Sequence, residues 1–359
     1  MKPNDLPDLR HAGILALRLD SMGDVVMTGP ALRQIKAHYP ESHLTLLTSE
    51  SGAMAGRHLP AVDRVLARAV PWMKGKSARW EAPLDSLVAE LRQARFDAAI
   101  IFTVYSQNPL PAALLCTQAG IPVRLAHCRE NPYDLLSHWV PEREPETGVR
   151  HEVRRQLDLA EVLTGPLPDA PLSLAIAPYH RETVAPLISA YGDGWFVLHP
   201  GASAASRRYP PGQYAEVIAK LYDRLGLVAV LTGSEAECPL VEAIREEAAC
   251  PTVSLAGQLD FPELAALIGL APLIICNNTG PSHVAAAMQT PVICLYALTN
   301  PQHTPWQVPS RVLYRDVSCR YCYRSACAEP GHPCLSGVSS EEVVNATLQL
   351  LSPQASLAL

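Results

Sequence analysis

The feature that most constrains how this chain can fold is a regular alternation of short apolar runs with longer amphipathic stretches. The short runs predict buried strands and the longer stretches predict helices, which is the pattern of a parallel sheet with crossover helices. In the first half we expect strands at 13–19, 43–48, 62–67, 96–102 and 122–126, and helices at 25–39, 84–94 and 153–163.

The alternation stops over residues 164–194, a proline-rich segment, and then begins again. Because 359 residues exceed the size at which one hydrophobic core usually stops growing, two domains are expected. We place a first domain at 1–180, a second at 181–338, and a C-terminal segment at 339–359 whose helix packs back on the first domain. The sequence thus predicts an α/β protein with two Rossmann-like, doubly wound parallel sheets and a cleft between them.

In the second half the expected strands are 195–198, 227–232, 252–255, 273–276 and 291–296, and the expected helices are 211–225, 236–248, 261–271, 280–289 and 339–351. Ligands of such sheets gather at the carboxyl ends of the strands. The polar loops at those ends are therefore the candidate binding segments.

The composition narrows the class of protein. Apolar residues make up 48% of the chain and charged residues 18%, which is typical of a globular protein. No run reaches the ~18 uninterrupted apolar residues of a membrane-spanning helix, and the first residues lack the basic-then-apolar profile of a secretory signal. We therefore expect a cytoplasmic protein. The formal net charge of −6 argues against a nucleic-acid partner.

The first polar loop, Ser21-Met22-Gly23-Asp24, follows the first expected strand. Gly23 lets a ligand approach the backbone closely. The carboxylate of Asp24 is a candidate general base toward a hydroxyl group. The alternative is that Asp24 only caps the helix that follows.

Two polar loops of the second half offer groups for phosphate and ribose. Loop 199–210 carries Ser203, Arg207 and Arg208. Paired guanidinium groups can clamp a phosphate, and the alternative is that they are solvated surface charges. Loop 231–237 carries Thr232 and Glu237. An acid at this place often binds a ribose hydroxyl, and helix capping accounts for it equally well.

A third loop, 276–283, joins an apolar run to a helix through Asn278, Thr279, Gly280 and His283. The first turn of a helix carries unpaired N–H groups and a partial positive charge, so such a turn suits a phosphate. The alternative is an ordinary strand-to-helix turn with Thr279 as its N-cap.

Four of the ten cysteines, Cys319, Cys322, Cys327 and Cys334, form a C-x2-C-x4-C-x6-C cluster. Four thiolates at this spacing can close around a structural zinc or iron ion, form two disulfides, or remain unligated thiols. The chain has no G-x-G-x-x-G, no P-loop and no nucleophile elbow, so hydride transfer, P-loop hydrolysis and serine-hydrolase chemistry all lack their expected motifs.

Taken in order, residues 18–26, 199–203, 278–283 and 319–335 resemble the motifs of glycosyltransferase family 9, the ADP-heptose:lipopolysaccharide heptosyltransferases. The resemblance runs from about residue 13 to 351. It implies a GT-B fold and metal-independent transfer with inversion at the anomeric carbon. It also implies an ADP-heptose donor held mainly by the C-terminal domain and a lipopolysaccharide-precursor acceptor, hence peripheral contact with the inner face of the inner membrane.

Roles follow by position from the resemblance. Asp24 matches the family's catalytic base, and Arg207 falls where the family usually has a lysine that contacts the donor phosphates. Glu237 is near the acid expected at the ribose. The remaining donor candidates are Ser203, Arg208, Thr232, Asn278, Thr279, Gly280 and His283, and the acceptor candidates are Ser21, Met22, Gly23 and Arg129.

Two positions depart from the family pattern. Asn278 stands where aspartate is common and Tyr209 where tryptophan is common. An amide cannot replace a carboxylate as a charged acceptor, so the donor sugar stays open. Arg150, Arg154 and Arg155 are further candidates for anionic groups of the acceptor, with a solvated face as the alternative.

Three alternatives remain at the level of the sequence. The chain could be a transferase of this family with a different nucleotide sugar and a protein or small-molecule acceptor. It could be a nucleotide-sugar epimerase of related fold, because a fold does not determine a reaction. It could also be a binding protein that kept the nucleotide site without catalysis.

Overall fold

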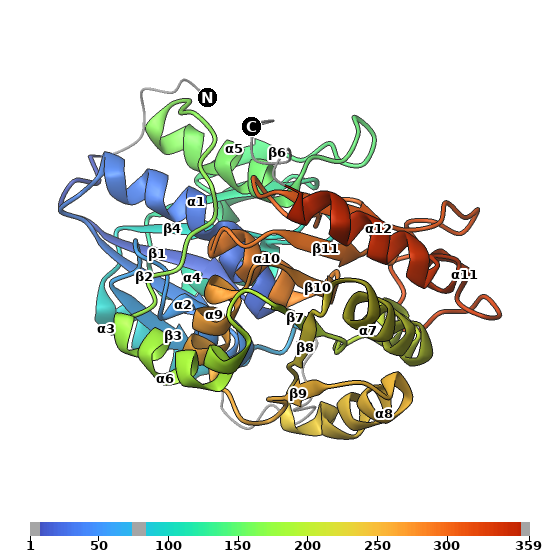
Figure 1. Cartoon of the computed structure of the whole chain (residues 1–359). Coiled ribbons are helices and arrows are strands. Elements are labelled where there is room, and N and C mark those ends of the chain that lie inside the picture. The colour runs from blue at the N-terminus through green and yellow to red at the C-terminus, as the bar shows by residue number, and fades with distance from the viewer. Residues whose placement is uncertain (1–7, 74–83, 353–359) are drawn as a thin grey trace. The chain divides into compact units, whose positions relative to one another are not determined.

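The computed structural model describes residues 8–73 and 84–352. The chain divides into two compact units, Met1–Ala175 and Ile176–Leu359. The boundary lies five residues before the expected position of 180, just ahead of helix α6 (Pro178–Ile188). Each unit is built around one six-stranded sheet (Figure 1).

The sheet of the first unit has the strand order β3-β2-β1-β4-β5-β6, and all neighbouring pairs are parallel. The strands are β1 (Gly13–Arg18), β2 (His43–Thr48), β3 (Arg64–Ala67), β4 (Ala98–Ile101), β5 (Val123–Cys128) and β6 (His138–Pro141). The helices are α1 (Met22–His38), α2 (Glu50–Gly56), α3 (Leu84–Ala94), α4 (Leu110–Gln118) and α5 (Glu152–Thr164).

The sheet of the second unit has the order β12-β11-β10-β7-β8-β9 and is also parallel. Its strands are β7 (Trp195–His199), β8 (Val228–Leu231), β9 (Thr252–Ser254), β10 (Ile274–Asn277), β11 (Val292–Leu295) and β12 (Ser310–Leu313). The helices after α6 are α7 (Pro211–Leu225), α8 (Cys238–Ala248), α9 (Phe261–Leu270), α10 (Gly280–Ala287), α11 (Pro333–Ser336) and α12 (Ser340–Leu351).

The doubly wound α/β class expected from the alternation is confirmed. It missed the helices α2, α4, α6 and α11 and two strands, and the two strands share a physical reason. Strand β6 forms one edge of the first sheet and β12 one edge of the second, and their residues are partly exposed. An edge strand needs no continuous apolar run, because one side of it faces solvent. The central strands β1, β4, β10 and β11 are almost completely buried and were readable as such.

Helix α12 packs against elements of the second unit. Its buried residues include Val343, Val344 and Leu350, and it packs against α7, β11 and β12 (Figure 1). Arg224 on α7 also forms an ion pair with Glu341 at 2.8 Å. The C-terminal helix is therefore part of the second unit. Its expected packing on the first domain stays a prediction.

Helix α1 also starts earlier than expected, at Met22 instead of residue 25. Pro30 consequently lies inside the helix and not near its start. A proline there removes one intrahelical hydrogen bond. Among the described residues, no helix is both long and apolar enough to cross a membrane.

Candidate active site

Asp24 lies in the first turn of α1, directly after the carboxyl end of β1. Its Oδ2 accepts hydrogen bonds from the Ser21 hydroxyl at 2.6 Å and from the Ser21 backbone N–H at 3.2 Å. Its Oδ1 lies 3.2 Å from the Arg18 guanidinium, and 15% of the side chain is exposed. Asp24 therefore caps the helix, as the structural alternative held, and it also presents a partly accessible carboxylate.

A buried arginine organises this end of the first sheet. The Arg18 side chain is fully buried and forms ion pairs with Asp20 at 2.9 Å, Asp24 at 3.2 Å and Glu152 at 2.8 Å. Burial by itself would lower the pKa of Arg18, but the charges of Asp20, Glu152 and Asp24 outweigh it and raise the pKa. Arg18 thus stays cationic and fixes the orientation of the Asp24 carboxylate.

Sequence reasoning assigned no role to Arg18 or Glu152. The only local signal was a charged residue at the end of an otherwise apolar strand, since β1 reads GILALR. A charged residue is almost never fully buried unless it is paired. Its partner Glu152 opens α5, 134 residues further along the chain, so no local pattern could have joined them.

Asp20 should make stability depend on pH. Burial, together with the charge of Asp24, raises the pKa of Asp20 to about 6 against the opposing charge of Arg18. A carboxyl group with a raised pKa in the folded state stabilises the fold while protonated, so its contribution is lost as pH rises from about 4 to 6. Two pKa units correspond to about 3 kcal/mol.

We expect the Asp20→Asn variant to lack this pH-dependent part of the free energy of unfolding. Urea unfolding of both proteins at pH 4, 5, 6 and 7 measures it, because other titrating groups cancel in the difference between variant and wild type. A pH-independent difference would contradict the raised pKa of Asp20.

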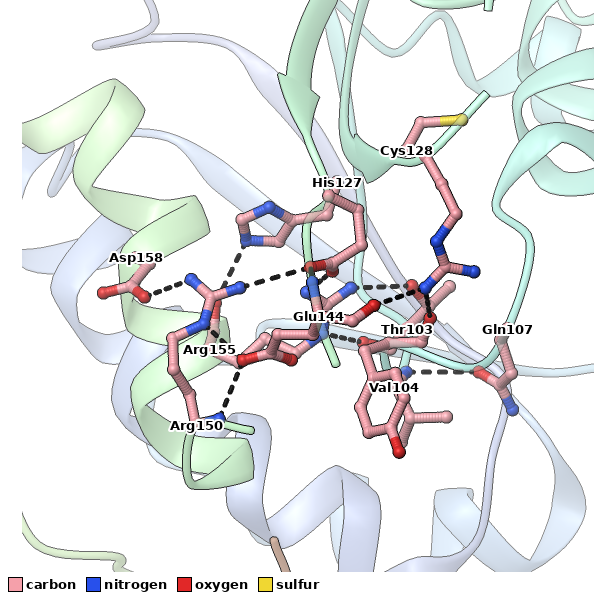
Figure 2. A network of polar contacts seen from close by, with 12 residues as sticks. Thr103, Val104, Gln107, His127, Cys128, Glu144, Arg150, Arg155 and Asp158 are labelled. Atoms are coloured by element: carbon pink, nitrogen blue, oxygen red, sulfur yellow. Dashed lines mark hydrogen bonds and ion pairs between the residues drawn. The ribbon is translucent and has the colours of Figure 1, made fainter. Parts of the chain in front are cut away.

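Near β5, β6 and α5, the arginines expected to face anionic ligands are paired internally (Figure 2). Arg155 pairs with Glu142, and Arg150 contacts Glu144 at 2.6 Å and also Asp158. Arg154 pairs with Asp158, Glu161 and Asp169. These three guanidinium groups are thus paired with carboxylates of the protein itself. Arg129 differs, because it donates to the backbone carbonyls of Tyr105 and Glu144.

In the second unit, the candidates Thr232 and Glu237 follow the carboxyl end of β8, and His199 ends the neighbouring strand β7. The His199 ring lies 3.0 Å from the Thr232 hydroxyl, and both side chains are buried. Glu237 accepts from the Ser234 backbone N–H at 2.8 Å, so it caps the following turn as the structural alternative held. A Cβ atom on Gly201 would lie 2.1 Å from Glu237 Oε1, so only glycine lets the β7 loop approach this carboxylate.

Asn278 is held by the backbone of the neighbouring strand end. Its Oδ1 accepts from the Ala297 backbone N–H at 3.1 Å, its Nδ2 lies 3.4 Å from the Ala297 carbonyl oxygen, and the residue is buried. An amide can serve both groups because it donates and accepts, whereas a carboxylate only accepts. Asn278 therefore joins the loop after β10 to the loop after β11.

Asn277, which sequence reasoning did not single out, anchors the same region. Its Oδ1 accepts from the Tyr209 backbone N–H and the Tyr214 hydroxyl, both at 3.0 Å, and its Nδ2 donates to the Pro200 carbonyl at 2.8 Å. Tyr209 is buried and donates its hydroxyl to the Val338 carbonyl at 2.7 Å. Asn277 and Tyr209 thus hold the β7 loop in place.

The turn into α10 has the features expected of an anion site. Thr279 is the N-cap residue, and Gly280 is the first residue of the helix, where the backbone N–H has no intrahelical acceptor. Within the described part of the chain, the buried Thr279 Oγ1 has no hydrogen-bond partner. His283 is buried one turn further, with its ring 6.4 Å from that of His303.

The side chains of Arg207 and Arg208 have different surroundings in the structure. Arg208 donates from Nε to the Ala202 carbonyl at 2.9 Å, which holds the loop together. Arg207 ends a short 3-10 turn, Ala205–Arg207, and its charge acts on Tyr296, next to the carboxyl end of β11. Ser203 is exposed on the same loop. Arg207 is thus the arginine of this pair whose charge reaches a neighbouring strand end.

The four clustered cysteines are free thiols. The charges of Cys319, Cys322 and Cys327 all act on Cys334, but burial is the first cause that raises the pKa of Cys334. Among the described residues, no three His, Cys, Asp or Glu side chains are arranged to hold a metal ion. The thiols therefore share one region without fitting a metal in this arrangement, and no disulfide joins them.

Comparison with known proteins assigns this arrangement to the glycosyltransferases. The family model described as glycosyltransferase family 9 (heptosyltransferase) matches residues 84–332. The chain belongs to glycosyltransferase family 9. Asp24 and its ion pairs with Arg18 lie ahead of the matched region.

The relatives extend over nearly the full chain. Lipopolysaccharide heptosyltransferase 2 of Salmonella typhimurium is 25% identical, covering 95% of this chain and 99% of the relative. Lipopolysaccharide heptosyltransferase 1 of Pseudomonas aeruginosa is 26% identical, covering 88% and 87%. The solved family 9 glycosyltransferase of Veillonella parvula has a TM-score of 0.78 at 22% identity, covering 96% and 98%, which supports the GT-B fold.

Proposed function

We propose that this enzyme transfers a heptose from ADP-heptose to a hydroxyl group of a lipopolysaccharide core precursor, with inversion at the anomeric carbon and without a catalytic metal. The names of the relatives support the sugar and the acceptor, since they are lipopolysaccharide heptosyltransferases. A structural neighbour, the E. coli heptosyltransferase WaaC, was solved with ADP-2-deoxy-2-fluoro heptose. The observation that carries the proposal is the accessible carboxylate of Asp24, held by buried Arg18.

In this proposal Asp24 is the general base. It takes the proton of the acceptor hydroxyl while that oxygen attacks the anomeric carbon, and the bond from that carbon to the ADP oxygen breaks. Attack opposite the leaving group inverts the configuration. A base contributes typically 10²–10⁴-fold to the rate when it is well placed. Arg18 orients Asp24 for this step, because its guanidinium lies 3.2 Å from the carboxylate.

The second unit would stabilise the leaving ADP. Negative charge grows on the diphosphate during transfer, and preorganised donors aimed at that charge lower the barrier. The groups proposed for this role are the Arg207 guanidinium, the Gly280 backbone N–H and the Thr279 hydroxyl, with Glu237 near the ribose. Asn278 and Arg208 would act indirectly, through the loops that they hold.

Binding of the nucleotide tests the donor side. We expect ADP and ADP-sugars to raise the melting temperature, because a ligand that binds only the folded state stabilises it. UDP, GDP and dTDP should give smaller shifts. Arg207→Met should weaken ADP binding at least tenfold, whereas Arg311→Met, which changes an exposed arginine on edge strand β12, should leave it unchanged. A response to UDP or GDP alone would contradict the ADP-heptose donor.

Product analysis separates transfer from epimerisation. A transferase releases ADP and forms a glycoside only when an acceptor is present, whereas an epimerase converts the nucleotide sugar by itself. Conversion of ADP-heptose without an acceptor would contradict the proposed transfer.

The cysteine cluster enters no step of this mechanism. Elemental analysis for zinc and iron on the purified protein tests the structural metal that the cysteine spacing allows.

A further inference from the structure

The first unit contains a cavity of about 80 Å³ at the carboxyl ends of β4, β5 and β6. Its lining includes Gln107, Asn108, His127, Arg129, Glu130 and Glu142. We propose that this cavity binds one edge of an uncharged sugar through neighbouring hydroxyl groups and is a subsite for the acceptor. The identification of the sugar as the acceptor rests on the proposed function.

His127 is the group that selects a ligand with hydroxyl protons. It is 4% exposed. Its Nε2 lies 3.3 Å from the Arg155 carbonyl oxygen, and Figure 2 draws this contact as a dashed line. A carbonyl only accepts, so Nε2 carries the proton and Nδ1 keeps a lone pair. Among the described residues, Nδ1 has no hydrogen-bond partner. Burial, with the charges of Arg155 and Arg150, lowers the pKa of His127 to about 3, so the ring stays neutral at pH 7.

The unprotonated Nδ1 of His127 needs a hydrogen-bond donor. A hydroxyl group can supply one, whereas an ionised carboxylate or phosphate monoester offers only acceptor oxygens. The cost of leaving such a buried acceptor unpaired is also what makes a polar site discriminate between ligands. His127 therefore favours a sugar hydroxyl over an acidic group.

The charges around the cavity also balance. Arg155 is neutralised by Glu142, with which it forms a buried ion pair. Arg129 and Glu130 contribute one charge of each sign. A lining of paired signs together with amides offers donors and acceptors in alternation, which suits hydroxyl groups because each one can both donate and accept.

The volume limits what can enter. About 80 Å³ is room for a small group, so the cavity admits one edge of a sugar and not a whole oligosaccharide. Asn108 accepts from the Leu110 backbone N–H at 2.8 Å through Oδ1, which fixes its amide at the rim. The remainder of a larger acceptor would extend into solvent.

The cavity is connected to the proposed base. Gln107, in its lining, donates a hydrogen bond to Asp20, and Asp20 is paired with Arg18, as is Asp24. Strand β4 is the direct neighbour of β1, so the loops that follow them leave the same edge of the sheet. A sugar bound in this cavity would therefore lie at the same end of the sheet as the Asp24 carboxylate, which is the proposed base for its hydroxyl.

Sugar binding can be measured without donor or acceptor by saturation-transfer NMR on the full chain. The probes are methyl α-D-mannopyranoside, which is uncharged, and methyl β-D-glucuronide, which carries a carboxylate. We expect the mannoside to bind at millimolar concentration and at least tenfold more tightly than the glucuronide. His127→Phe and Asn108→Ala should each weaken the mannoside at least fivefold. Arg143→Met, a change at an exposed arginine outside the cavity lining, should not.

Equal mannoside binding in wild type and both variants, or preference for the glucuronide, would overturn the proposal. Asn108 is exposed, so its variant keeps the test decisive if His127→Phe fails to fold. ADP thermal shifts on the same proteins report on the donor site separately. If ADP fails to stabilise wild type while the mannoside results hold, the donor proposal fails and the sugar cavity stands. In transfer assays, Asn108→Ala should raise the acceptor KM at least fivefold with kcat within about twofold.

Discussion

Replacing Asp24 by asparagine should lower kcat by at least about a hundredfold while ADP binding stays within about twofold of wild type. Asparagine keeps an oxygen that can cap α1, so the substitution removes the charge and the proton acceptor but not the cap. The expected loss follows from the usual contribution of a general base. A coupled assay of ADP release measures kcat, and calorimetric titration with ADP measures binding.

The control for this experiment is Asp260→Asn. Asp260 also caps a helix, since its carboxylate accepts from the Glu263 backbone N–H at 2.9 Å, but it lies at the start of α9 in the second unit. It should retain full turnover. Wild-type kcat in the Asp24→Asn protein would reject Asp24 as the base, and equal losses in both variants would show that helix capping, not proton transfer, limits the rate.

Replacing Arg18 by methionine should destabilise the first unit by about 3–5 kcal/mol, the usual cost of removing one partner of a buried ion pair. The substitution removes the guanidinium that pairs at 2.8 Å with Glu152, whose side chain is fully buried. Methionine occupies a similar length of apolar space, so the loss reports mainly on charge. Urea unfolding at pH 7 measures the change in the free energy of unfolding.

Two further variants sharpen this result. Arg68→Met breaks an exposed ion pair with Glu90, formed at 2.8 Å with 45% of the Arg68 side chain exposed, and should cost at most about 1 kcal/mol. The double change Arg18→Met with Glu152→Gln should recover part of the lost stability, because the uncompensated buried carboxylate is gone. A loss in Arg18→Met no larger than in Arg68→Met would contradict the role of Arg18 as the buried centre of this cluster.

The positions of the polar loops could be read from local patterns, and so could the helix caps. Asp24 and Glu237 were each weighed as a cap or a functional acid, and the structure shows that each one caps. The packing of α12 could not be read in this way, because its apolar face fits any apolar surface. Its place on α7 depends on partners such as Arg224 that lie more than a hundred residues away.

The candidate site shows the same division. Residue identity at Asn278 suggested an altered sugar contact, but the neighbouring strand end supplies Ala297, whose backbone satisfies the amide. Likewise, three arginines that the sequence would offer to an acceptor are paired with carboxylates from α5 and from the segment that follows β6. A sequence records which charges are present, and it does not record which of them neutralise one another.

Periodicity was enough to establish two parallel α/β sheets with polar loops at their strand ends, because strand and helix patterns arise from neighbours a few residues apart. The ion pairs of Arg18 with Glu152, the Asn277 anchor of the β7 loop and the cavity at His127 required the folded chain. Each brings together groups distant in sequence. Their strength depends on burial, which removes competing water and is a property of packing and not of any single segment.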